Sequence, residues 1–146
     1  MSTGSYDVVS EHHHIHRLVG RLEDWIERRQ QEGNAWLAGL TNRLENLTSD
    51  LGPHFKGEER VVFSDIRARL PRLVDTVDRL IEQHRRMEHD LSLIATHAKS
   101  LNLADSGARD ELAEQLAKVL RLLKVHEQQE TELILTAYGQ DLGEAD

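Results

Sequence analysis

The stretch ELAEQLAKVLRLLKVHEQQETEL, residues 111–133, decides the fold because apolar side chains recur in it at alternating spacings of four and three. This spacing follows the repeat of about 3.5 residues found in packed helices, and it places the recurring side chains on one helix face. The members of this seam are Leu112, Leu116, Val119, Leu123, His126, Glu130 and Leu133. The stretch therefore predicts a long amphipathic helix that turns one histidine and one glutamate toward the core.

Three other stretches show the same alternating spacing, and each carries histidine within its apolar seam. The first seam of the chain consists of Val8, His12, Ile15, Val19, Leu22 and Ile26. The second consists of Leu40, Leu44, Leu47, Leu51, His54, Glu58 and Val61. The third consists of Leu73, Val77, Leu80, His84, Met87, Leu91 and Ile94. Four such seams predict four helices packed around a common core.

The expected helices are long, and the segments between them are short. We expect them at about 6–31, 35–69, 71–101 and 108–138, with a loop at 102–107 before the last one. Short connections between long helices favour antiparallel neighbours, so the predicted fold is an all-α, up-down-up-down four-helix bundle. We expect one domain over residues 1–146, with frayed ends at about 1–5 and 140–146.

Local signals mark the expected helix ends. Ser5 is a suitable first N-cap, and Asp105 or Ser106 suits the last helix. Gly139 is expected to end that helix, and Gly52-Pro53 predicts a kink within the second, because proline removes a backbone donor.

Composition excludes several classes of protein. The net charge of −8 opposes binding to nucleic-acid phosphates. No apolar run is long enough to span a membrane, and the N-terminus lacks the features of a signal peptide, so the cytoplasm is the expected compartment. The absence of cysteine removes disulfides and thiolate metal sites.

Six ionisable residues occupy seam positions: His12, His54, Glu58, His84, His126 and Glu130. The positions on neighbouring helices lie at similar numbers of residues from the expected turn between them. At a rise of about 1.5 Å per residue, all six residues therefore fall at one level of the bundle. Burying such groups unpaired costs several kcal/mol each, and a metal cluster would offset that cost. Histidine and carboxylate donors suit iron, manganese or zinc. We expect two metals, each with two imidazoles, bridged by Glu58, Glu130 and an oxo or hydroxo group.

These residues stand in the stretches Glu11-His12-His13-His14-Ile15, His54-Phe55-Lys56-Gly57-Glu58-Glu59, Gln83-His84 and His126-Glu127-Gln128-Gln129-Glu130. The order His, His-x-x-x-Glu, His, His-x-x-x-Glu resembles the hemerythrin-like (HHE cation-binding) domain over nearly the whole chain. The resemblance implies a four-helix bundle with a non-haem di-iron centre, with manganese or zinc less expected than iron.

The chain departs from the oxygen-carrying members that it resembles. Those carriers have a fifth histidine ligand, in His-x-x-x-His on the third helix, and an aspartate on the fourth. Here Met87 and the off-seam Glu88 follow His84, and Glu130 stands four residues after His126. Similar ligand sets occur in hemerythrin-like proteins linked to peroxide or nitric oxide handling, and in an iron- and oxygen-sensing domain of a ubiquitin-ligase subunit.

The sequence leaves three candidate functions. The preferred one is redox chemistry with O2, peroxide or nitric oxide, including catalase-like peroxide decomposition, with an electron donor as partner. The alternative is reversible O2 or iron binding and sensing without turnover. A metal-free helical interaction module is the least favoured, because it leaves the aligned ligands unexplained.

Histidines and glutamates beside the seams are assigned mainly to surface roles. These are His13, His14, His89, His97, Glu59 and Glu127. His16 lies one turn from His12 and is a candidate outer contact or alternative ligand.

Overall fold

The computed structural model describes residues 8–33, 35–101 and 106–145, with the side chains of 8, 106 and 140–145 left out of the description. All regular structure in these ranges is helical, which confirms the predicted all-α class. The elements are α1 (Val8–Glu27), α2 (Ala35–Gly57), the π-helix η2 (Glu58–Phe63), α3 (Ser64–Arg69), the 3-10 helix η3 (Pro71–Leu73), α4 (Val74–Ser100) and α5 (Ser106–Ala145).

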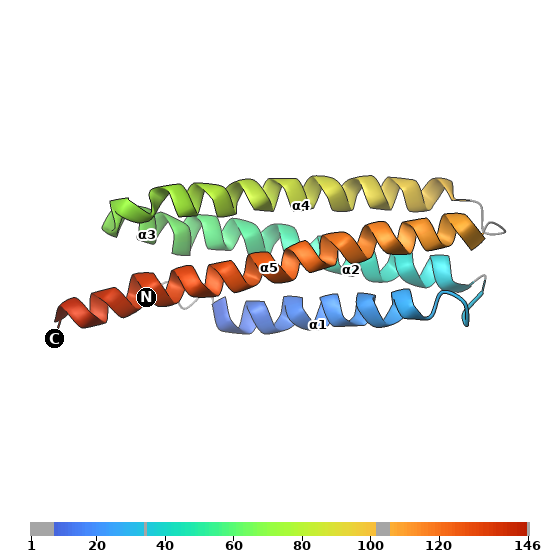
Figure 1. Cartoon of the computed structure of the whole chain (residues 1–146), viewed down its shortest axis with the longest axis horizontal. Coiled ribbons are helices and arrows are strands. Elements are labelled where there is room, and N and C mark those ends of the chain that lie inside the picture. The colour runs from blue at the N-terminus through green and yellow to red at the C-terminus, as the bar shows by residue number, and fades with distance from the viewer. Residues whose placement is uncertain (1–7, 34, 102–105, 146) are drawn as a thin grey trace.

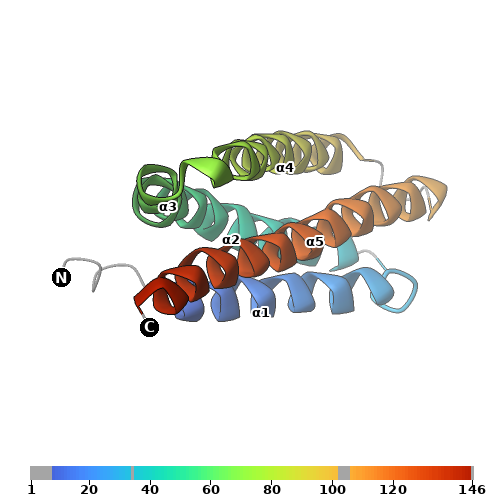
Figure 2. The same cartoon turned by 60° about the vertical axis from the view of Figure 1, so that its left-hand side comes forward.

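The long helices lie side by side and form a bundle. Followed by colour in Figure 1, each of them runs back beside the one before it, and Figure 2 shows α5 lying between α1 and α4. Contacts join α1 to α2, α2 to α4, α4 to α5, and α5 back to α1. Every helix therefore turns one face toward a shared interior.

The first turn of the bundle is fixed by two tryptophans. The indole N–H of Trp25 donates to the carbonyl of Trp36 at 2.8 Å, and that of Trp36 donates to the carbonyl of Trp25 at 2.9 Å. Gly33 has a φ of +57°, which glycine adopts without strain. Helix α1 ends at Glu27, before the predicted boundary near residue 31, because the segment after it forms this turn.

The second predicted helix contains an irregularity that the sequence did not predict. The α-helix continues through Pro53 to Gly57. A π-helix follows at Glu58–Phe63. Its wider turn shifts the buried face by one residue, so Val62 is buried while the seam member Val61 is only half-buried.

The fourth predicted helix extends further than expected at both ends. It begins at Ser106, so Gly107, predicted in the loop, is helical, and it continues past Gly139 to Ala145. Gly139 does not have the positive φ of a terminating glycine, and glycine within a helix costs only about 1 kcal/mol. The alternative cap Asp105 and the first cap Ser5 lie outside the described residues.

The apolar core is divided into two clusters. The larger joins α1, α2, α4 and α5, and includes Leu22, Leu44 and Leu116. The smaller joins η2, α3, α4 and α5, and includes Phe63 and Leu133. A layer of buried polar side chains lies between the two clusters along the helices. In the described part of the chain, no helix is both long and apolar enough to cross a membrane.

Candidate metal centre

All six seam histidines and glutamates come together in this polar layer. His12 comes from α1, His54 from α2, Glu58 from the start of η2, and His84 from α4. His126 and Glu130 come from one face of α5. Five of the six are between 0 and 2% exposed, and the His12 side chain is 20% exposed. The predicted residues therefore share one nearly dry site.

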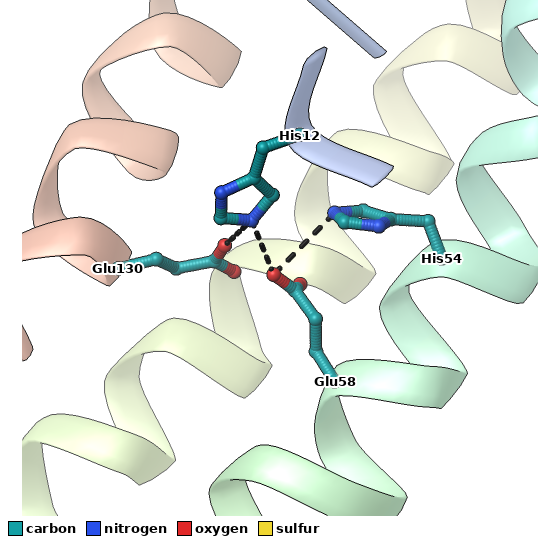
Figure 3. Close-up of side chains that lie close together, drawn as sticks. All are labelled: His12, His54, Glu58 and Glu130. Atoms are coloured by element: carbon teal, nitrogen blue, oxygen red, sulfur yellow. Dashed lines mark hydrogen bonds and ion pairs between the residues drawn. The ribbon is translucent and has the colours of Figure 1, made fainter. Parts of the chain in front are cut away.

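One half of the layer surrounds His12 (Figure 3). Its Nε2 lies 2.9 Å from Glu58 Oε2 and 3.1 Å from Glu130 Oε1. His54 Nε2 lies 3.4 Å from the same Glu58 Oε2. These four side chains offer ligand atoms that lie within 4.8 Å of one another.

The other half surrounds His84. Its Nε2 lies 3.0 Å from Glu130 Oε2 and 3.2 Å from Glu58 Oε1. His126 Nε2 contacts the same Glu130 Oε2. His84, His126, Glu58 and Glu130 form a second group whose ligand atoms lie within 4.8 Å of one another.

The two groups share their carboxylates and divide their imidazoles. Each could hold a metal ion with two imidazole nitrogens and two carboxylate oxygens, a donor set suited to iron, manganese or zinc. Glu58 Oε1 is buried, makes no hydrogen bond, and lies 3.2 Å from His84 Nε2. Since a buried carboxylate oxygen without a hydrogen bond is costly, this atom suits a cation placed between the imidazoles.

Three of the four histidines are oriented by a second contact at Nδ1. That atom lies 3.3 Å from Glu11 Oε1 in His54, 2.7 Å from Glu59 Oε2 in His84, and 2.6 Å from Gln83 Oε1 in His126. An acceptor at Nδ1 holds the proton there and leaves Nε2 free for a metal.

Aromatic packing fixes His84 further. The Phe55 ring stacks on its imidazole at a centroid distance of 3.8 Å and an interplanar angle of 9°. Phe63 lies on the same imidazole at 5.7 Å. Both phenylalanines are buried, so this imidazole has little freedom to rotate away from the site.

Without metal, imidazolium groups balance the two carboxylates. Burial lowers the pKa of His12, but hydrogen bonds and charges from Glu130 and Glu58 outweigh it and raise this pKa to about 10. The pKa of His84 is likewise raised to about 9, against burial, by Glu130, Glu58 and Glu59. Burial raises the pKa of Glu130, but its interactions with Glu58 and with the hydrogen-bonding histidines lower it well below its usual value.

These shifts predict how the stability of the metal-free protein depends on pH. His12 and His84 hold their protons more tightly when folded, so their stabilisation is complete below about 6.5, the pKa of free histidine, and is lost as pH rises toward 9 to 10. The melting temperature of the metal-free protein should fall across this range. Metal-bound protein should show a smaller fall, because bound metal has already displaced those protons. Melting curves of both forms from pH 6 to about 10 test this, and a metal-free melting temperature that rises with pH would contradict it.

The other histidines lie outside both groups. His13, His16 and His89 are exposed. His14 contacts Asp50 at 2.6 Å, and His97 contacts Gln115. His16 lines a pocket beside His12 without joining either group of ligand atoms.

Glu88 also lies apart from the site. It is exposed on α4, and its Oε2 lies 3.5 Å from the position that a β-carbon on Gly52 would occupy. Met87, the seam residue beside it, is buried in the larger apolar cluster.

Sequence reasoning missed four residues around the site. The structure contradicts the assignment of Glu59 and Glu127 to solvated faces: Glu59 contacts His84, and Glu127 has a buried oxygen with no hydrogen-bond partner. Burial raises the pKa of Glu127 to about 7. The sequence pattern predicts no role for Glu11 or Gln83. All four stand next to one of the six site residues in the chain, and that adjacency was the available signal.

The comparisons with known proteins agree with this geometry. The family model described as hemerythrin HHE cation binding domain matches residues 3–138. Neither curated proteins nor solved structures gave a significant match.

Proposed function

The chain belongs to the hemerythrin HHE cation-binding family, and we propose that its polar layer binds two iron ions with Glu58 and Glu130 shared between them. The observation that carries this proposal is the division of the six residues into two groups of four that have only these carboxylates in common. His12 and His54 would serve one ion, and His84 and His126 the other.

The proposed activity is redox chemistry with a small oxidant. A bound iron pair would supply electrons and Lewis acidity toward O2, peroxide or nitric oxide. Four protein donors for each ion leave coordination positions for such a ligand. The Nδ1 contacts of Glu11, Glu59 and Gln83 would hold the imidazoles in place throughout turnover.

Electron balance separates two forms of this activity. Disproportionation of two peroxide molecules to water and O2 needs no outside reductant. Reduction of O2 to peroxide consumes two electrons and two protons, so it requires an electron donor as a partner. Peroxide decomposition by the isolated protein is therefore the simpler activity to expect.

Reaction with O2 tests the proposal against oxygen carriage. We expect iron-loaded, reduced protein to consume O2 irreversibly, because two imidazoles for each ion leave a more open site than a carrier has. We also expect it to decompose added peroxide. An oxygen electrode and the optical spectrum follow both reactions, and protein lacking iron is the control. Release of the consumed O2 under vacuum, with return of the reduced spectrum, would favour a carrier.

Iron sensing without turnover is the second candidate. The polar layer interrupts the apolar core, so metal occupancy should influence how firmly the helices pack. A sensor would show a large difference in protease resistance between metal-free and loaded forms, together with no peroxide decomposition.

A further inference from the structure

A pocket between α1 and α5 leads from the surface to the polar layer. It has a volume of about 420 Å3, and its lining includes His12, His16, Glu127 and Thr131. His12 is the least buried of the six site residues, with a 20% exposed side chain. This pocket therefore reaches the site at its most accessible member.

The Glu127 carboxylate also lines this pocket, and one of its oxygens lacks a hydrogen-bond partner. Its Oε2 is buried and has no hydrogen-bond partner in the structure. Lys124 also lines the pocket, but its ammonium group pairs with Glu23 at 2.7 Å. A buried carboxylate oxygen that accepts no hydrogen bond is costly, so the position favours an incoming cation.

Two other pockets, both between α4 and α5, suit a cation less well. A pocket of about 130 Å3 between α4 and α5 reaches His126, but its lining includes Arg86, Leu122 and Val125. A guanidinium group and apolar side chains oppose the passage of a hydrated metal ion. The larger pocket between the same helices includes Arg79 and none of the six site residues.

We propose that divalent metal enters through the pocket between α1 and α5, and that Glu127 is its first protein ligand. The inference rests on the proposed metal centre. The carboxylate of Glu127 would replace water on the arriving ion, which would then pass to His12, Glu58 and Glu130. Because Glu127 belongs to neither final group, it would affect the rate of loading and leave the final metal content unchanged.

Loading kinetics test this role without any measurement of activity. Metal-free protein is mixed rapidly with Co2+, whose visible absorption reports coordination by protein ligands. Glu127→Gln should load about tenfold more slowly than the unaltered protein, the effect of about 1.4 kcal/mol on the barrier. Both should reach the same final metal content. Glu127→Asp, which keeps the charge, should load faster than Glu127→Gln.

Glu132→Gln is the matched control. It removes one carboxylate from the same helix, but Glu132 is exposed and lines the larger pocket between α4 and α5. Its loading rate should equal that of the unaltered protein. Equal rates for Glu127→Gln and the unaltered protein would overturn the entry role and leave the metal centre standing. A lower final metal content in Glu127→Gln would also overturn it, by making Glu127 a resident ligand. Failure of the unaltered protein to bind metal would overturn both proposals.

Discussion

Removal of metal should lower the melting temperature of this protein by about 10 °C or more. A site held at about 100 times its dissociation constant adds about 2.7 kcal/mol, and each kcal/mol shifts the melting temperature of a chain of this size by roughly 2–4 °C. The contributions of two such sites add up to the expected fall in melting temperature of about 10 °C or more. The physical cause is the dry layer, in which the two carboxylates depend on protonated imidazoles when metal is absent.

Calorimetry of chelator-treated and reloaded protein measures this shift at one pH. Restoring Fe2+ to the metal-free protein should restore the higher melting temperature. The variant Glu58→Ala,Glu130→Ala is the control, because it lacks both shared carboxylates and should not respond to added metal. Equal melting temperatures for metal-free and loaded forms of the unaltered protein would show that the layer is stable without an ion.

Loss of either shared carboxylate should remove at least one metal ion from each chain. Glu130 lies within 3.1 Å of histidines on α1, α4 and α5, and Glu58 lies within 3.4 Å of histidines on α1, α2 and α4. In the described part of the chain, no other carboxylate belongs to either group of ligand atoms. We therefore expect Glu130→Ala and Glu58→Ala to contain no more than one ion. Glu130→Gln keeps the side-chain shape and should show the same loss.

Glu88→Ala is the control for that comparison. Glu88 stands four residues after His84, as Glu58 does after His54 and Glu130 after His126, yet it is exposed and outside both groups. Its metal content should match that of the unaltered protein. If Glu88→Ala emptied the site and Glu130→Ala did not, the assignment of the shared carboxylates would be wrong.

The heptad pattern predicted that these six residues would come together inside the bundle, because it reports which side of each helix faces the core. His84 and Glu130 stand in phase with leucines on their helices, and that phase holds from Val77 to Ala98 on α4 and from Leu112 to Ala137 on α5. The six residues lie at similar numbers of residues from the turns between the helices. This similarity predicted that all six would lie at one level of the bundle. Nothing beyond helical geometry was needed for this part.

Features that depend on contacts between helices could not be predicted in this way. The π-helix after Gly57 changes the phase of the second seam, and no local signal distinguishes Val61 from Val62. Glu59 contacts His84 because of how neighbouring helices are rotated, which a single-helix pattern does not contain. The burial of Glu127 likewise depends on the element packed beside α5.

The count of iron atoms for each folded chain, taken together with the optical spectrum, tests the central claim most directly. Protein produced with ample iron should contain two iron ions per chain, as the two groups of four side chains require. A histidine-ligated, bridged iron pair should absorb in the near ultraviolet, and this absorption should change when azide or peroxide is added. A folded protein that binds one ion or none under these conditions would contradict the two-metal centre.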